Sequence, residues 1–428
     1  MRYEPLPADF HAANRRRLSE AIGDESIAII DTADVLRRPG DFEHPFRPDS
    51  NFYYLTGVDE PDAVLVLAPG HPNPHLREVL FLRETSDFIA LWAGQRLTQA
   101  EGTARSGVAT VLWLDELEPV LGRLVGQFRT IYLNDHPTLE AGPLSPSGRR
   151  AADLRTKLPL HDLRSATSIL GRLRTIKAPA EIAQIRRAVD ATAAGLDRAW
   201  SALATGVPEY ALEAELTAEF TRRGATGSAF GAIIGAGRHS TTIHHATSAT
   251  PVAAGDLVLF DVGAEAGYYA ADITRTVPAG GRFTPRQRAV YEAVYRAQQA
   301  GIKLHRPGAT ILEIDETMRR SLTKSLVDLG EISAKAAAGP QADEHLRPYY
   351  AHISHHLGLD VHDTGTPRLK LEPGMVVTCE PGLYLAKEGI GVRLEDDILI
   401  TKTGHEVLSR SIPSAPDDIE AAIARSRA

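Results

Sequence analysis

Apolar residues recur at helical spacing in four stretches of the second half of the chain, and each stretch begins at a helix-start signal. In the first stretch they lie three or four positions apart from Ile182 to Leu203. The second stretch stops at Gly224, a typical helix end, and in the fourth Glu313 completes a capping box. We expect the four helices to begin at Pro179, after Pro208, at Thr284–Pro285 and at Thr310.

The first pair of helices is followed by a stretch with the pattern of a β-hairpin. The stretch LVLFDVGAEAGYYAADITRTVP runs from Leu257 to Pro278, with a turn signal at Ala264 to Gly267. If the turn is centred between Ala266 and Gly267, Asp261 and Asp272 face each other directly across the hairpin. Two carboxylates so placed need a proton or a cation between them, unless the stretch is a solvated hairpin tip in another register.

A second acid-bearing hairpin is expected after the second pair of helices. Its strands are Met375 to Glu380 and Gly391 to Ile400, and it carries Glu380 and Glu395. Two helices and a hairpin with two acids therefore occur twice. This repetition suggests a pseudo-symmetric domain in which the two hairpins converge.

The first part of the chain has a different organisation. Strand-like runs alternate with helical or turn-rich stretches, which predicts an α/β domain over residues 1–170 and a second domain over 171–428. The expected strands are Ile27 to Ile30, Ala63 to Ala68, Val79 to Leu82 and Thr130 to Leu133. No phosphate-binding glycine motif follows these strands. At GAIIGAGRHS the third glycine of a dinucleotide fingerprint is replaced by Ser240, and no G-x-S-x-G motif of a serine hydrolase is present.

Composition is that of a soluble globular protein. The 428 residues contain 47 Lys plus Arg and 55 Asp plus Glu, a net charge of −8 without long single-sign blocks, which argues against a nucleic-acid partner. The single cysteine, Cys379, excludes a disulfide within the chain, fits a reducing compartment, and lies in the apolar run MVVTC, which favours a buried thiol over a nucleophile. No apolar run has membrane-spanning length, so we expect no membrane partner and a cytoplasmic location.

Four carboxylates on two converging hairpins could not all stay ionised without cations. The segment YYAHISHHLGLDVHDTG adds nitrogen donors at His352, His355, His356 and His362. Carboxylates with one imidazole favour one or two divalent ions such as Mn²⁺ over a structural zinc, and two ions sharing carboxylates point to hydrolysis. The alternatives are a surface cluster of histidines and, for Arg393, either a surface ion pair or a group that orients the nearby ligand Glu395.

These motifs resemble those of the pita-bread metallopeptidases, the family that includes aminopeptidase P, prolidase and methionine aminopeptidase. The resemblance spans about Pro179 to Thr401 through DVGAEAGYYAADITRT, SHHLGLDVHD, CEPG and RLEDD. The stretch FRPDSNFYYLTGVDEPDAVLVLAP, from Phe46 to Pro69, resembles the N-terminal domain of aminopeptidase P and prolidase. The resemblance as a whole implies an α/β N-terminal domain followed by an α+β pita-bread catalytic domain.

The resemblance also implies a site with two divalent metal ions, most plausibly Mn²⁺, with Co²⁺ or Zn²⁺ as alternatives. Asp261 would chelate one ion, Asp272 and Glu395 would bridge both, and His355 and Glu380 would complete the second. An activated water would attack the scissile carbonyl, with Glu380 as proton shuttle. The remaining implied roles belong to His244 near the substrate's amino end and scissile bond, His362 at the carbonyl or oxyanion, Arg393 beside a ligand, and Trp92, which some relatives bring near a neighbouring subunit's site.

Several positions depart from the family's pattern. Many relatives have histidine four residues before the ligand histidine, where this chain has Ala351 followed by His352. His245 and His356 replace aromatic or large apolar residues, which would alter the walls of the pocket. The connection from Gly330 to Pro348 has no clear match and could shape the pocket entrance.

The first functional hypothesis is an Xaa-Pro aminopeptidase, which removes the N-terminal residue from peptides with proline at the second position. Family members are often dimers or tetramers, so a homo-oligomer is expected. A prolidase, which cuts only Xaa-Pro dipeptides, is the alternative. A methionine aminopeptidase is disfavoured because those enzymes lack this N-terminal domain. A non-catalytic pita-bread binding protein or a creatinase-like hydrolase is disfavoured because all five ligand positions are filled.

Overall fold

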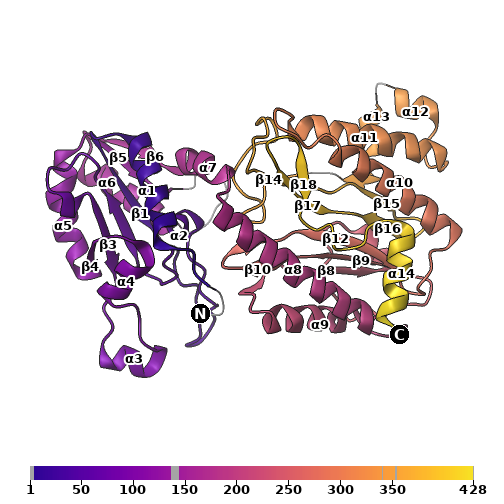
Figure 1. The fold of residues 1–428 in the computed structure, drawn as a ribbon, viewed down its shortest axis with the longest axis horizontal. Helices are drawn as coiled ribbons and strands as arrows, with labels where there is room; N and C mark the ends of the chain where they lie inside the picture. Colours follow the sequence, from indigo (N-terminus) through magenta and orange to yellow (C-terminus); the bar gives the residue numbers. More distant parts are fainter. Residues whose placement is uncertain (1–3, 136–143, 340, 352–353, 428) are drawn as a thin grey trace. The chain divides into compact units, whose positions relative to one another are not determined.

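A computed structural model describes residues 4–135, 144–339, 341–351 and 354–427 of the chain (Figure 1). The chain divides into two compact units. The N-terminal unit comprises Pro5–Arg174, and the C-terminal unit runs from Thr175 to the end of the chain and includes Glu4. The sequence predicts the boundary after residue 170, four residues before the division after Arg174. Among the described residues, no helix is both long and apolar enough to cross a membrane.

The N-terminal unit is built on a mixed sheet with the strand order β4-β3-β2-β1-β5-β6. Its strands are β1 (Ser26–Asp31), β2 (Val64–Leu67), β3 (Glu78–Leu82), β4 (Thr110–Trp113), β5 (Thr130–Leu133) and β6 (Asp162–Ser165). The four strands that the sequence predicts are β1, β2, β3 and β5, which are central and apolar. The edge strands β4 and β6 escaped prediction because they are more exposed, and β6 reads DLRS with only its leucine turned partly inward.

Helices and short 3₁₀ turns surround this sheet. They are α1 (Ala8–Ile22), α2 (Ser50–Thr56), η1 (Pro74–Leu76), α3 (Asp87–Ala93), α4 (Gln99–Ser106), η2 (Leu114–Glu116), α5 (Leu117–Leu124), η3 (Val125–Gln127), α6 (Pro146–Lys157) and α7 (Thr167–Thr175). Apolar side chains of α5 and α6 pack against β1, β2, β3 and β5 to form the core of the unit.

The C-terminal unit contains the four predicted helices. They are α8 (Pro179–Ala202), α9 (Glu209–Arg222), α10 (Pro285–Ile302) and α11 (Ile311–Asp328). The capping box at Thr310 and Glu313 is formed, and an equivalent box joins Thr284 to Gln287. In Figure 1 the pair α8 and α9 lies on one side of the strands and the pair α10 and α11 on the other. The remaining elements are η4 (Gly237–Thr241), α12 (Ala334–Ala338), α13 (Ala342–Leu346) and α14 (Pro416–Ser426).

Between the helix pairs lie four sheets of three strands each, counted over the described residues. Their orders are β11-β10-β7, β12-β9-β8, β13-β15-β16 and β14-β17-β18. The strands are β7 (Gly227–Ser228), β8 (Ile233–Ala236), β9 (Leu257–Val262), β10 (Ala264–Ala266), β11 (Tyr269–Ala270), β12 (Ile273–Pro278), β13 (Tyr350–Ala351), β14 (Val376–Cys379), β15 (Gly382–Leu385), β16 (Ile390–Arg393), β17 (Asp396–Ile400) and β18 (His405–Val407).

The first acid-bearing hairpin forms, but its predicted register is wrong. Asp261 lies opposite Thr274, so Asp272 occupies the diagonal position two residues away and not the facing one. A shift of two residues leaves the alternation of side chains unchanged. The two acids therefore still share one face of the hairpin, within reach of each other.

The turn of this hairpin explains the shift. Ala266 pairs with Tyr269, which leaves Gly267 and Tyr268 as a two-residue turn with φ values of 55° and 68°. Positive φ at both central positions is the hallmark of a type I′ turn, which favours Asn or Gly. The sequence signal pointed one residue too early because a tyrosine rarely adopts this conformation.

The second hairpin consists of four short strands where two long ones were expected. Cys379 pairs with Asp396 in one sheet, and Gly382 pairs with Arg393 in the next. Glu380 and Glu395 occupy the break between these two ladders, in positions that the shared register places opposite each other. The chain thus changes sheet at the residues that carry the acids.

Candidate metal centre

The predicted ligands of both hairpins line a single pocket of the C-terminal unit. The pocket has a volume of about 710 Å³. The residues predicted to act in the site all contribute to its wall: Asp261, Asp272, His355, Glu380, Glu395, His244, His362 and Arg393. The convergence of the two hairpins therefore brings together residues separated by more than a hundred positions in the sequence.

Three of these side chains form the closest group. One ligand atom each of Asp272, His355 and Glu395 lies within 4.8 Å of the others. His355 Nε2 is 3.5 Å from Asp272 Oδ2 and 3.4 Å from Glu380 Oε1. Oxygen and nitrogen atoms at this spacing can share an ion.

The backbone fixes which nitrogen of His355 faces the carboxylates. Its Nδ1 lies 3.0 Å from the carbonyl oxygen of His356, which can only accept a hydrogen bond. In the neutral imidazole Nδ1 therefore carries the proton, and Nε2 offers its lone pair to the pocket. The backbone of His355 is in turn bonded to Thr378 of β14 in both directions, which positions the histidine beside the second hairpin.

Burial and mutual repulsion raise the pKa values of the carboxyl groups. Burial followed by the charges of Asp261 and Glu380 raises the pKa of Asp272 well above its ordinary value. The pKa of Glu395 rises in the same way, through burial and then the charges of Asp272 and Glu380. Burial also raises the pKa of Glu380 to about 7. The protein groups alone do not compensate these charges, which is the electrostatic condition for a cation site.

Arg393 lies beside a different acid from the one expected. Its guanidinium is buried and donates to Asp261 of the first hairpin, and to the hydroxyl of Tyr384 at 2.9 Å. It reaches Glu395 only through Thr274, whose hydroxyl accepts from Arg393 Nε at 3.1 Å and donates to Glu395 Oε2 at 2.7 Å. The surface alternative is therefore wrong, and Arg393 lies beside a carboxylate as the other alternative expects, with Asp261 as its direct partner and Glu395 linked through Thr274.

The two additional histidines lie at the pocket wall near the carboxylates. The ring centroids of His362 and His355 are 4.3 Å apart. Burial, followed by the neighbouring His355 and His244, lowers the pKa of His362. A neutral imidazole is favoured there, as is suitable for a hydrogen bond to a substrate oxygen.

Sequence reasoning missed residues that hold the ligands. The motifs DITRT and RLEDD contain Thr274 and Asp397, but no role was assigned to either. The backbone N–H of Asp272 donates to Asp397 Oδ2 at 3.3 Å, and Thr378 donates to Glu380 Oε1 at 3.1 Å. Their polarity inside apolar strands is a usable signal, because buried polar side chains need partners.

The departures from the family pattern fall in different places. His245 lines the pocket, as expected, whereas His356 is buried against Gly365 and is not part of the pocket wall. His352 lies outside the described residues, and no described residue of the Gly330 to Pro348 connection lines the pocket. Cys379 is the last residue of β14 and lies buried in the apolar core, where burial raises the pKa of its thiol.

Comparison with known proteins identifies the family. Residues 183–402 match the model of metallopeptidase family M24, and residues 11–132 match that of the aminopeptidase P N-terminal domain. The chain is 36% identical to the Xaa-Pro aminopeptidase of Escherichia coli K12 over 96% of this chain and 97% of that one.

Solved structures show the same likeness. The E. coli aminopeptidase P with the inhibitor Pro-Leu matches with a TM-score of 0.90 at 34% identity, covering 99% of this chain and 100% of the other. The aminopeptidase PepP of Pseudomonas aeruginosa matches with a TM-score of 0.90 at 35% identity, covering 99% of both chains. With its α/β N-terminal unit, its pita-bread C-terminal unit and this pocket of acids and histidines, the chain belongs to metallopeptidase family M24.

Proposed function

We propose that the protein is an Xaa-Pro aminopeptidase, which removes the N-terminal residue from peptides with proline at the second position. The observation that carries the proposal is the gathering of Asp261, Asp272, His355, Glu380 and Glu395 in one pocket. The support for the proline preference is the similarity, over nearly the whole chain, to proteins named Xaa-Pro aminopeptidase. A non-catalytic binding protein would not need this complete set of ligands.

The residues present fit a pair of divalent ions. The charge of Asp272 raises the pKa of Glu395, and Asp261 Oδ1 is buried with no hydrogen-bond partner in the described part of the chain. We propose that these residues would hold the two ions, with Asp261 on one, His355 and Glu380 on the other, and Asp272 and Glu395 shared by both. Four carboxylates and one imidazole suit Mn²⁺, with Co²⁺ or Zn²⁺ as alternatives. A zinc-substituted form of E. coli aminopeptidase P is among the similar solved structures.

Two ions in this position would lower the pKa of a water molecule and polarise the scissile carbonyl group. We propose that Glu380 accepts the proton of the attacking water and passes it to the leaving proline nitrogen. Its side chain is 17% exposed at the pocket wall, so water and peptide can reach it. His362 donates a hydrogen bond to the carbonyl oxygen, and His244 binds near the amino end of the substrate.

Arg393 and Thr274 hold the ligands in place. The guanidinium of Arg393 fixes Asp261, and Thr274 links the same guanidinium to Glu395. Ligands that are hydrogen-bonded in this way keep the orientation that an ion requires.

We also propose a homo-oligomer and a cytoplasmic location. On α3 the side chains of Phe88, Leu91 and Trp92 are 71%, 80% and 76% exposed, a contiguous apolar surface of the kind that pairs with another protein. The cytoplasmic location rests on the single reduced cysteine. Chromatography with light scattering at several concentrations tests the oligomer, and a monomer at all of them would contradict it.

The deciding experiment is a substrate panel with Mn²⁺ present, comparing Xaa-Pro dipeptides, Xaa-Pro-Xaa tripeptides and longer peptides with alanine in place of proline as controls. We expect release of the first residue from the tripeptides and longer peptides, and little cleavage of the alanine controls. Cleavage of dipeptides alone would identify a prolidase. No cleavage of any peptide by protein with two bound ions would contradict a peptidase.

A further inference from the structure

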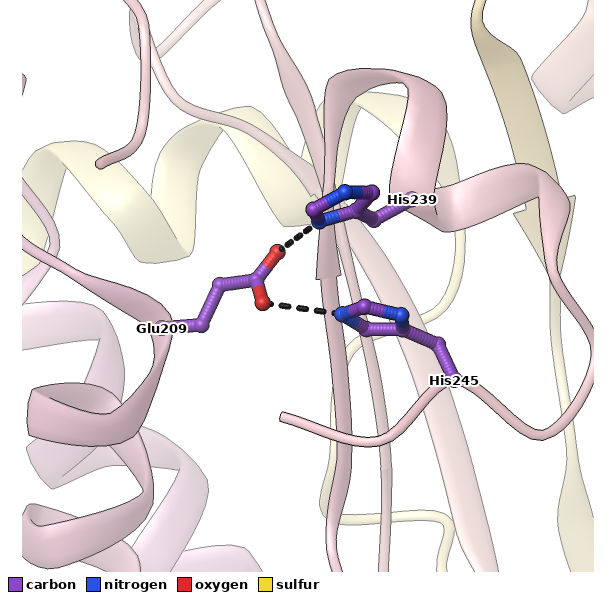
Figure 2. A group of neighbouring side chains, drawn as sticks. All are labelled: Glu209, His239 and His245. Carbon is purple, nitrogen blue, oxygen red and sulfur yellow. Dashed lines mark hydrogen bonds and ion pairs between the residues drawn. The ribbon is translucent and has the colours of Figure 1, made fainter. Parts of the chain in front are cut away.

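One buried carboxylate lies outside the candidate metal centre and has not been assigned a role in the reaction above. Glu209 is the first residue of α9, and its side chain is completely buried. Both of its oxygens contact the segment between β8 and β9, which carries two of the pocket histidines, His244 and His245. Figure 2 shows the carboxylate of Glu209 beside the imidazoles of His239 and His245, with one oxygen turned to each ring.

Five donors converge on this one carboxylate. Oε1 accepts from the backbone N–H of Ala236 at 2.9 Å and lies 2.9 Å from His239 Nδ1. Oε2 lies 2.9 Å from His245 Nε2, and accepts from the backbone N–H of Ser248 at 3.0 Å and from its hydroxyl at 2.7 Å. Burial opposes ionisation, but these hydrogen bonds outweigh it and keep the pKa of Glu209 below its ordinary value. The group is therefore an anion at neutral pH.

The donors come from both ends of one loop. Ala236 ends β8, and Ser248 lies twelve residues later, so Glu209 closes the segment between them as a side-chain bridge. The part of this loop from Thr242 to Thr250 contains no helix or strand. His244 lies between the two anchors, is exposed, and has no hydrogen bond to its ring within the described part of the chain. Its place in the pocket wall is therefore determined by the anchors on either side.

The same three side chains also have the spacing of a metal site, since one atom each of Glu209, His239 and His245 lies within 4.8 Å of the others. The acceptor capacity of the carboxylate argues against an ion there. Two carboxylate oxygens offer about four lone-pair sites, and the N–H of Ala236 together with the N–H and hydroxyl of Ser248 already takes three of them, which leaves at most one for an ion. The two imidazoles stack with ring centroids 4.3 Å apart, and each turns one nitrogen toward an oxygen of Glu209.

We propose that Glu209 is a positioning residue for the peptidase reaction, which acts by holding the loop from Ala236 to Ser248 so that His244 stays at the metal centre. This inference rests on the proposed function for the role of His244. The anchoring of the loop itself can be measured without any activity.

Replacement of Glu209 by glutamine is the most informative substitution. Glu209→Gln keeps the shape of the side chain but replaces one acceptor oxygen by an NH₂ group that can only donate. Whichever way the amide turns, it faces the backbone N–H of either Ala236 or Ser248, and a backbone amide cannot exchange its donor for an acceptor. One end of the loop is therefore released. Glu215→Gln on the same helix is the matched control, because the one ion pair of Glu215 within the described residues is with Arg198.

The experiment combines kinetics on an Xaa-Pro tripeptide with hydrogen exchange of the loop. We expect Glu209→Gln to lower kcat about 10- to 100-fold, with KM changed much less and the ions retained. In a His244→Ala background the same substitution should lower kcat by less than about twofold, since its effect passes through His244. Amides of the loop should exchange about tenfold faster in Glu209→Gln and at the wild-type rate in Glu215→Gln.

Equal losses of kcat in the wild-type and His244→Ala backgrounds would overturn the proposal, and so would loop exchange that does not change. If Glu209→Gln does not fold, His239→Ala, which removes one partly exposed partner, is taken through the same cycle with smaller expected effects. A third ion per chain that is lost in His239→Ala would make the group a metal site and would also overturn the proposal. An inactive wild-type enzyme would contradict the proposed function, whereas the exchange result would still decide whether Glu209 anchors the loop.

Discussion

The raised pKa of Glu380 predicts that removing its charge stabilises the metal-free protein. In Glu380→Gln the amide oxygen can still accept the hydrogen bond that Thr378 donates at 3.1 Å, while the negative charge beside the other acids disappears. The variant therefore resembles the protonated form of Glu380. The other carboxylates are present in both proteins, and the charge of Glu380 no longer raises the pKa values of Asp272 and Glu395 in the variant, which acts in the same direction.

The size of the effect follows from linkage between proton binding and folding. The folded pKa is about 7 against an ordinary value of 4.5. At roughly 1.36 kcal/mol per pH unit this interval corresponds to about 3 kcal/mol, an upper value because the side chain keeps some contact with water. A raised pKa means that the folded protein binds more protons than the unfolded chain between these pH values. The free energy of unfolding of the wild type therefore falls, relative to the variant, as the pH rises from 4.5 through 7.

The assay is urea unfolding of chelator-treated protein, followed by the fluorescence of Trp200, which is buried in α8 of the C-terminal unit. Trp92 and Trp113, the other two tryptophans, are replaced by Phe in both proteins. We expect similar stability at pH 4.5 and a more stable Glu380→Gln at pH 8. Added Mn²⁺ should reverse the order at pH 8, because ions bind the folded wild type more tightly. The electrostatic argument would be refuted if the two proteins had the same free energy of unfolding at pH 8, or if the difference between them were equal at both pH values.

The remaining predictions concern the ligands and their supports. Asp272→Ala and Glu395→Ala should each lose metal and hydrolysis, because each removes a proposed bridging ligand; elemental analysis that finds two ions per chain in either variant would contradict the bridging roles. His362→Ala should keep both ions and lose about 100-fold in kcat, since it acts on the substrate oxygen; loss of metal in this variant would instead identify a ligand. Thr274→Val keeps the side-chain shape but breaks the link from Arg393 to Glu395. We expect metal affinity to fall about 10- to 100-fold in competition with a chelator, and an unchanged affinity would show that the hydroxyl does not support the ligand.

Local patterns in the sequence were sufficient for the four long helices of the C-terminal unit and for the choice of the acids. The four long helices of the C-terminal unit begin at the proline and threonine signals because capping and periodicity involve residues within a few positions of one another. The acids at Asp261, Asp272, Glu380 and Glu395 were identifiable because carboxylates inside apolar strands need a counter-charge. The exposed apolar side chains of α3, among them Trp92, and the edge strands of the N-terminal unit could not be predicted from local patterns, because their sequences lack such a signal.

Tertiary structure decided which partners these residues meet. Tyr268 adopts a left-handed conformation, and the register of the first hairpin is therefore shifted by two positions. Asp261 and Asp272 still share a face because side chains alternate between the two faces of a strand with a period of two. Arg393 meets Asp261, 132 residues away, and Glu209 meets the ends of a loop that begins 27 residues later. The sequence by itself predicted that the acids of the two hairpins and His355 would gather at one site. Which side chains pair in this pocket was decided only by the packing of the hairpins, because a buried charge bonds to the nearest group that the folded chain presents.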